Sequence, residues 1–305
     1  MVQRTKKNLN SSSTGGAKWL AILNPWLWIA PAVLCIVVFL FYPMLNTIWL
    51  SFFSNDSSRF VGLANYAYIF TDAGMLEVLR NNLLWLVLGT LLTVFLGLIT
   101  AVLADRVRIE STIKAMIFIP MAISFVGASV IWRFVYDYKT SGQAQVGLLN
   151  AILTSFHLQP QAWLIDTRFN NIALIIVYVW MWTGFCMVIL SAALKSIPTE
   201  LLEAAKLDGA NDINIFFRIT VPMISPTIAV VATTVIINIL KIFDVIYVMT
   251  GGNYQTNVIA VEYYQQLFNF NNFGIGSALA VLLLLTILPV MYFNIRHIRS
   301  QEVQR

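Results

Sequence analysis

Three aromatic residues spaced along one apolar stretch are the first candidates for chemistry. Tyr178, Trp182 and Phe185 lie at positions i, i+4 and i+7, so on a helix they share one face. Aromatic faces stack well on the C–H surfaces of sugar rings, because both surfaces are apolar and flat. The stripe is therefore a candidate sugar-binding surface. Packing against lipid or against other helices is the alternative explanation of the same residues.

A polar stripe marks a second apolar stretch. Thr234, Asn238 and Lys241 follow the same i, i+4, i+7 spacing, and Asp244 lies three residues after Lys241. Polar groups in hydrocarbon are costly, so we expect this stripe to face a bundle interior or a water-filled cavity. A structural hydrogen-bond cluster between helices, or a snorkelling Lys241–Asp244 pair near the outer interface, would explain the same pattern.

Motifs of catalysis and metal binding are missing from the sequence. It contains no G-x-x-x-x-G-K-[ST] phosphate loop, no H-E-x-x-H and no G-x-S-x-G. His157 and His297 are isolated, and Cys35 and Cys186 lie inside apolar runs, so no metal site or disulfide framework is expected. The sequence therefore predicts no catalytic residue, no metal and no cofactor bound by this chain.

The elements that carry these stripes are predicted to be membrane-spanning helices. The chain has 305 residues, of which 59% are hydrophobic and 11% charged, whereas soluble domains carry about 25% charged residues. A soluble all-α protein with deeply buried helices is the alternative. Runs long enough to cross the hydrocarbon core predict an all-α polytopic membrane protein with about six spans, at roughly 26–52, 82–104, 113–136, 172–194, 226–249 and 275–295.

Basic residues give the predicted spans an orientation. With the N-terminus in the cytoplasm, that side carries Arg4, Lys6, Lys7, Lys18, Arg106, Arg108, Lys114, Lys195, Lys206, Arg218, Arg296, Arg299 and Arg305. The opposite side carries only Arg59, Arg80, Lys139 and Arg168. Because basic residues concentrate on the cytoplasmic side, we expect both termini there. The predicted divisions are a flexible tail over 1–22, a transmembrane domain over 23–300 with a cytoplasmic loop at 196–222, and a short tail over 301–305.

That cytoplasmic loop has the sequence of a short, well-terminated helix followed by a second one. Pro198 suits the first helical turn, and Glu200 complements the helix dipole there. Gly209 fits the left-handed position that ends a helix, and Asn211 can cap a second helix that carries Phe217. We therefore expect a helix–turn–helix along the cytoplasmic surface of the membrane.

The first of these two helices presents a small-residue face. Leu201, Ala204 and Ala205 lie at i, i+3 and i+4, with the charged Glu203 beside them. Two alanines allow a partner to approach closely, which favours a docking surface. An interfacial helix that merely joins two spans would show the same amphipathic pattern.

The whole loop resembles the EAA loop of permeases from ATP-binding cassette (ABC) importers. The matching positions are Ile197-Pro198, Glu200-Leu201, Glu203-Ala204-Ala205, Asp208-Gly209-Ala210, Phe217, Ile219-Thr220 and Pro222. Segments elsewhere resemble the sugar-importer branch, which includes maltose, α-glucoside and glycerol-phosphate permeases. They are Ala30-Pro31-Ala32, Tyr42-Pro43, residues 61–66, Phe243-Asp244, Thr250-Gly251-Gly252, Gly274 and Ala278-Leu279-Ala280.

Two further segments narrow the resemblance within that branch. Residues 118–127 and 147–150 are most similar to α-glucoside permeases and to relatives that import glucosylglycerol. The chain departs from the branch at Asn253-Tyr254, where a Gly/Pro step is usual. This departure leaves the shape of the loop after Gly252 open.

The resemblance implies a non-catalytic permease subunit in the bacterial plasma (inner) membrane. It implies that Glu203, Ala204, Ala205, Asp208, Gly209, Phe217 and Pro222 couple the subunit to an ATPase. The implied partners are a second homologous permease, a cytoplasmic ABC ATPase dimer that holds ATP and Mg, an extracytoplasmic solute-binding protein, a sugar or glycoside, and the lipid bilayer. Nucleic acid is not among them.

Two other function classes remain as alternatives. A secondary sugar transporter driven by an ion gradient usually has sequence repeats, broken helices and carboxylates at mid-membrane depth. Here only Asp244 is a candidate for such a carboxylate. An intramembrane enzyme would need a catalytic motif that the sequence does not contain.

Overall fold

The structure is a computed structural model that describes residues 28–140 and 142–302, and its described elements are helical apart from one β-bridge between Phe53 and Phe60. The predicted tail at 1–22 and the last residues, 303–305, lie outside this description. The elements are η1 (Val37–Phe41), α2 (Tyr42–Leu50), α3 (Ala64–Thr71), α4 (Ala73–Leu84), η2 (Trp85–Gly89), α5 (Thr90–Ala104), α6 (Glu110–Phe118), η3 (Ile119–Ala122), α7 (Phe125–Val135), α8 (Leu148–Ser155), α9 (Asn170–Lys195), α10 (Thr199–Leu207), α11 (Asp212–Ile215), η4 (Phe216–Thr220), α12 (Val221–Leu240), α13 (Asp244–Met249), α14 (Ile259–Tyr264), η5 (Gln265–Asn269) and α15 (Phe273–Glu302).

Within the described residues, five helices are long and apolar enough to cross a membrane, and a bent helix pair makes a sixth candidate. The five are Trp28–Leu50, Ala73–Ala104, Asn170–Lys195, Asp212–Leu240 and Phe273–Tyr292. The prediction of an all-α protein with about six spans is therefore confirmed. Of the described residues, 28–49 belong to one compact unit, and the residues from Leu50 onward belong to a second.

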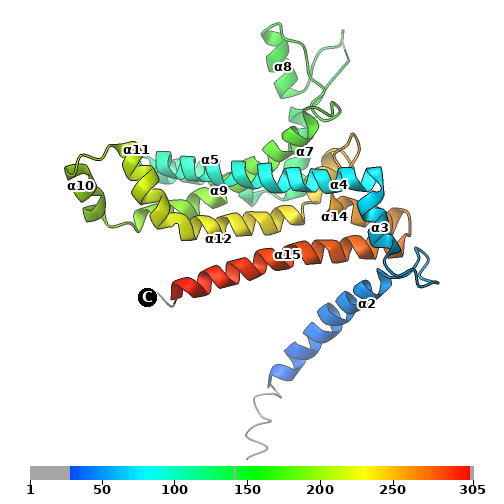
Figure 1. Ribbon diagram of the computed structural model, residues 1–305. Coiled ribbons are helices and arrows are strands. Elements are labelled where there is room, and N and C mark those ends of the chain that lie inside the picture. Colours follow the sequence, from blue (N-terminus) through cyan, green and yellow to red (C-terminus); the bar gives the residue numbers. More distant parts are fainter. Residues whose placement is uncertain (1–27, 141, 303–305) are drawn as a thin grey trace, which may run out of the picture. The chain divides into compact units, whose positions relative to one another are not determined.

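Helix α9 supplies much of the core of the second unit. Its side chains Leu174, Val177, Met187 and Leu190 are fully buried. Helix α9 packs against α5 and α12 (Figure 1), and also against α6. At Gly97, a Cβ would overlap the Cβ of Cys186, so α5 and α9 touch almost backbone to backbone. Small residues permit such close approach between helices in a membrane.

The third predicted span is not one helix, which corrects the prediction of a continuous span over 113–136. Helices α6 with η3 and α7 meet at an angle of 100°. Pro120 lies in the short 3-10 turn η3 and lacks a backbone N–H, so it cannot continue the hydrogen-bond ladder. The Ser124 hydroxyl then accepts a hydrogen bond from the Gly127 N–H and starts a new helix.

The fifth predicted span, 226–249, is also placed differently in the structure. A continuous helical run begins at Asp212 and ends at Leu240, and Lys241–Phe243 separate it from the short helix α13. Helix α13 packs on α7, so the two segments that follow the breaks in the third and fifth spans support each other. The second span likewise begins earlier than predicted, at Ala73.

The loop after α13 contains the predicted glycine turn. Gly251 and Gly252 have φ values of +65° and +80°, and Tyr254 and Gln255 follow at +56° and +60°. The Asn170 side chain donates to the Tyr254 carbonyl at 2.5 Å. An asparagine amide at the start of α9 therefore fixes the loop shape that the sequence left open.

Candidate coupling elbow and transport site

The predicted elbow helix is present as α10, and its start differs from the prediction by one position. Pro198 has φ −58° and ψ 128°, so it precedes the helix as the N-cap residue and does not lie in the first turn. Glu200 lies in that turn, as predicted. Its negative charge there complements the partial positive charge of the helix N-terminus.

Gly209 ends α10 in the expected left-handed conformation, with φ +83°. The Gly209 N–H donates to the Lys206 carbonyl and the Ala210 N–H to the Ala205 carbonyl, both at 3.0 Å. This pair of bonds is the Schellman motif, which satisfies carbonyls at a helix end. The elbow therefore turns sharply within two residues of Asp208, the C-cap.

Asn211 caps the next helix, because its side chain accepts a hydrogen bond from the Asn214 N–H at 2.8 Å. That helix is not a separate surface element, as the predicted helix–turn–helix required. Helices α11, η4 and α12 form one continuous apolar run from Asp212 to Leu240. A movement of the elbow is therefore a movement of the end of the fifth span.

One face of α10 is open to solvent in this single chain. Leu201 is 42% exposed and Leu207 89% exposed, and Glu203, Ala204 and Asp208, which were predicted to couple the subunit to an ATPase, are also exposed. Phe217 and Pro222 are exposed on the following helix, whereas Ala205 is partly buried. The predicted coupling residues are thus accessible except for the partly buried Ala205, and they are divided between α10 with its C-terminal turn and the helix that follows.

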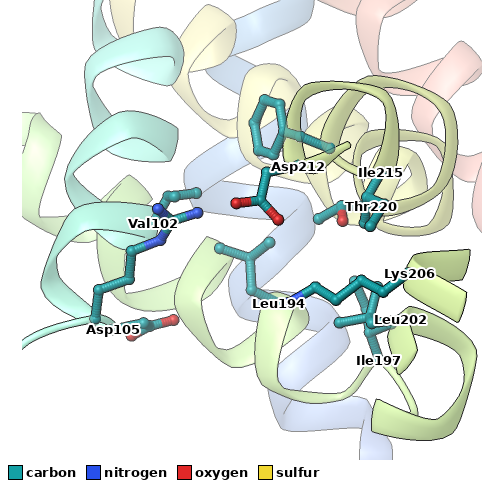
Figure 2. A pocket seen from close by; sticks show the side chains of 11 residues that line it. Val102, Asp105, Leu194, Ile197, Leu202, Lys206, Asp212, Ile215 and Thr220 are labelled. Atoms are coloured by element: carbon teal, nitrogen blue, oxygen red, sulfur yellow. The ribbon is translucent and has the colours of Figure 1, made fainter. Parts of the chain in front are cut away.

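A cavity of about 250 Å³ separates α10 from the ends of the spans. Leu202 and Lys206 of α10 point toward Asp212 of the next helix and Leu194 of α9 across this space (Figure 2). Ile197 and Ile215 are buried at its walls. The elbow is therefore fixed at its two ends while its middle keeps room to move.

An ion-pair cluster beside this cavity was not predicted from the sequence. The Lys114 ammonium lies 2.5 Å from Asp105 and 2.6 Å from Glu110, and Lys195 also pairs with Glu110. Ser191 donates to Asp105 at 2.8 Å. The cluster joins the α5–α6 connection to the last turn of α9, immediately before the elbow. The sequence signal was the i, i+4 spacing of Glu110 and Lys114; the other members come from distant positions.

The aromatic stripe exists, and one of its members is covered by other rings. The Tyr178 ring stacks between Phe125 and Trp182, with centroid distances of 6.3 and 6.0 Å. Tyr178 is fully buried, whereas Trp182 and Phe185 are partly buried. Trp182 and Phe185 meet edge to face at 5.2 Å. In this conformation Tyr178 supports the stripe from behind, and Trp182 and Phe185 are its accessible rings.

The polar stripe lies on the helix next to the aromatic one. The Tyr178 hydroxyl reaches the Val235 carbonyl of α12 at 3.5 Å. Thr234 and Asn238 are partly buried, and each donates to a carbonyl one turn earlier in its own helix. Lys241 is exposed just after α12 ends. Among the described ion pairs none joins Lys241 to Asp244, so the pair that the sequence analysis gave as an alternative explanation is not formed here.

Residues 93–298 match the family described as binding-protein-dependent transport system inner membrane component. The chain belongs to this family. The permease is 56% identical to the osmoprotective compounds uptake permease protein GgtC of Synechocystis, over 92% of this chain and 100% of the relative. It is 46% identical to the alpha-glucoside transport system permease protein AglF of Rhizobium meliloti, over 90% of this chain and 82% of the relative.

A solved structure supports the fold of the permease. A chain of the bacterial alginate ABC transporter, in complex with an alginate pentasaccharide-bound periplasmic protein, matches with a TM-score of 0.74. The two chains are 23% identical, and the match covers 90% of the permease and 95% of the other chain. The family match and the two relatives show that the permease is a multi-pass inner-membrane transport subunit.

Proposed function

We propose that the permease forms, with a second homologous permease, the path by which a neutral glycoside of the α-glucoside or glucosylglycerol type enters the cell. The observation that carries this proposal is the stacked aromatic stripe in the buried helix α9, beside the amide and hydroxyl groups of α12. Two close relatives named for osmoprotective compounds and for alpha-glucosides support the same substrate class.

Substrate contact in this proposal falls to Trp182 and Phe185 on one helix and to Thr234, Asn238 and Lys241 on the other. Flat rings cover the apolar face of a sugar, while amide and hydroxyl groups exchange hydrogen bonds with its hydroxyls. Tyr178 orients Trp182 through their stacked rings, 6.0 Å apart. The side chains of Tyr178, Trp182 and Phe185 are uncharged, and the Lys241 ammonium can donate hydrogen bonds to sugar hydroxyls, so these groups suit a neutral glycoside.

The energy for transport comes from a partner in this proposal. A cytoplasmic ABC ATPase dimer binds the exposed face of α10 and holds the ATP and Mg, and this chain binds no cofactor. When the dimer closes, it moves α10, and the movement passes to α12 through the continuous helix that begins at Asp212. It passes to α6 through the ion pair of Lys195, at the end of α9, with Glu110. Such a rigid-body change switches the path between its two sides.

The remaining proposed partner is an extracytoplasmic solute-binding protein that delivers the substrate. The alginate transporter with a similar fold was solved with such a periplasmic protein.

An apolar groove of about 840 Å³ between α5 and α12 offers the second permease a surface on which to pack. Thr90 lines this groove, and its hydroxyl is buried without a hydrogen-bond partner in the described residues.

The decisive experiment reconstitutes the permease with the ATPase, the second permease and the binding protein proposed as its partners. ATP-driven uptake of methyl α-glucoside and of glucosylglycerol is measured in proteoliposomes, with an alginate oligosaccharide as the mismatched substrate. Uptake of either glycoside, with ATP turnover stimulated by the loaded binding protein, supports the proposal. Uptake of neither glycoside, by a complex whose ATPase the binding protein does stimulate, would refute the substrate class.

A crosslink tests the docking surface separately. A cysteine at Ala205 is expected to capture the ATPase in native membranes when all subunits are expressed. A cysteine at Ser155, in α8 beyond the opposite end of the bundle (Figure 1), is the matched control and should capture none. If Ala205→Cys never captures a nucleotide-hydrolysing subunit, α10 is not the docking helix.

A further inference from the structure

A cavity at the other end of the bundle has the chemistry of a second sugar site. It measures about 230 Å³ and lies between the outer end of α7, the segment 162–165 and the loop after α13. Arg133, Asp137, Tyr138 and Tyr254 contribute its charged and aromatic walls. Drug-sized sites usually measure roughly 300–1,000 Å³, so this cavity suits one sugar ring and not a whole oligosaccharide.

One buried amide joins two of the walls of this cavity, the chain at Asp137 and the segment that begins at Gln161. Asn150 is fully buried, and its side-chain nitrogen donates to the Asp137 carbonyl at 2.9 Å and to the Gln161 carbonyl at 3.0 Å. Its oxygen accepts from the Gln161 N–H and from the Trp163 indole N–H. Every hydrogen-bonding position of the amide is therefore used. The cavity is preformed, which lowers the entropy cost of binding.

Tyr254 occupies a strained backbone position at the edge of the cavity. Its φ of +56° is one that glycine adopts freely and tyrosine does not. Such strain costs roughly 1–3 kcal/mol and is concentrated at functional sites. Tyr254 is 49% exposed, so burial of its ring does not explain why a tyrosine stands there. Asn170 fixes the carbonyl of Tyr254 by the 2.5 Å bond described above.

The polar groups of the cavity suit hydroxyls better than a charged ligand. Within the described residues, the Arg133 guanidinium donates one hydrogen bond, to the Val248 carbonyl at 3.2 Å. The Asp137 carboxylate has one ion-pair partner, Lys139 at 3.3 Å. A donor and an acceptor of opposite charge therefore line the same cavity as three tyrosines, Tyr136, Tyr138 and Tyr254. Vicinal hydroxyls can bond to both charged groups, while either a cation or an anion would meet one like charge.

We propose that this cavity is an outer glycoside-binding site, in which Tyr254 stacks on one sugar ring before the substrate enters the transmembrane path. The inference rests on the proposed function, because the ring it binds belongs to the transported glycoside. It adds a site, formed by α7, the segment 162–165 and the loop after α13, that is separate from the aromatic stripe of α9. A site of this kind retains a sugar released beside the membrane until the path opens.

The test measures sugar binding to the assembled transporter in lipid nanodiscs, without binding protein. All variants, and the parent complex to which they are compared, carry Trp182→Ala, so that the aromatic stripe of α9 contributes less to the measured sugar binding. Tyr254→Gly is expected to weaken binding of radiolabelled methyl α-glucoside about fivefold, as the loss of one ring contact predicts. Tyr254→Phe keeps the ring and should bind as Tyr254 does. Asp137→Asn, which keeps the shape of the side chain, should also weaken binding.

The Tyr254→Gly variant distinguishes sugar recognition from folding, because glycine adopts a φ of +56° without strain. A purely structural role for Tyr254 predicts that Tyr254→Gly binds sugar like the parent complex and unfolds at an equal or higher temperature. That result would overturn the proposal. A change in the affinity for ligand-free binding protein, with sugar binding unaltered, would also overturn it, by showing a docking surface instead. Uptake by the complex with the unsubstituted permease tests the proposed function independently. Failure of the proposed function and failure of the outer site are therefore distinguishable.

Discussion

Replacing Gly209 should uncouple the permease without preventing its insertion. A Cβ placed on Gly209 would meet no atom within 4 Å, so no steric clash with other residues is involved. The cost is that of the backbone alone, because φ is +83° and L-residues are disfavoured there by about 1–2 kcal/mol. A β-branched residue falls at or above the upper end of this range. Gly209→Val therefore shifts the local equilibrium of the helix end about 5- to 30-fold toward the frayed state.

Fraying would break the two hydrogen bonds that turn the chain after α10, those of the Gly209 and Ala210 N–H groups. Hydrogen exchange at these two amides should accelerate about tenfold in Gly209→Val within the assembled transporter. ATP-driven uptake should fall together with it, while the amount of permease in the membrane stays unchanged. Retained ATP hydrolysis without uptake would indicate that the ATPase still binds but no longer moves the spans.

Gly209→Asn is the matched control, because asparagine tolerates the left-handed region better than other residues with a side chain. It should keep slow exchange and most of the uptake. If the valine and asparagine variants transport equally well with the ATPase bound, the left-handed cap is not needed for coupling. If valine abolishes uptake while exchange at both amides stays slow, the effect has another cause, and the energetic reasoning above fails.

Three further perturbations follow from the packing. Lys114→Met leaves the Asp105 carboxylate without its ion-pair partner at 2.5 Å. Because a partly buried charge then has no partner, the free energy of unfolding should fall by about 2 kcal/mol, which thermal unfolding measures. Adding Asp105→Asn should restore much of this loss, and no recovery would show that the ion pair does not account for it. Gly97→Val places side-chain atoms of α5 on Cys186 of α9. It should prevent assembly of the complex, which size-exclusion chromatography measures. A normal elution profile would mean that α5 and α9 can move apart at little cost in free energy. Trp182→Ala should reduce uptake about tenfold with assembly unchanged, and equal uptake would remove the sugar-stacking proposal while leaving the architecture intact.

Local patterns predicted the features that depend on residues close together in the chain. The left-handed Gly209 and the Asn211 cap were both placed correctly, because the hydrogen bonds that make a cap join residues three to five positions apart. The shared face of Tyr178, Trp182 and Phe185 was correct for the same reason, since helical spacing fixes which side chains lie on one side. The orientation of the spans remains a prediction from the distribution of basic residues.

Contacts between residues that are far apart in the sequence could be identified only in the packed structure. The sequence did not show that Phe125 covers the ring of Tyr178, or that Lys195 reaches Glu110. The sequence also predicted continuous spans where the structure has two helical breaks, near Pro120 and at Lys241. The apolar pattern continues through both positions, whereas the helix does not. Composition decides which segments enter the membrane, since transfer into hydrocarbon is nearly a sum over residues. Where a helix bends, and which side chains are covered, depends on neighbours that meet only after the chain has folded.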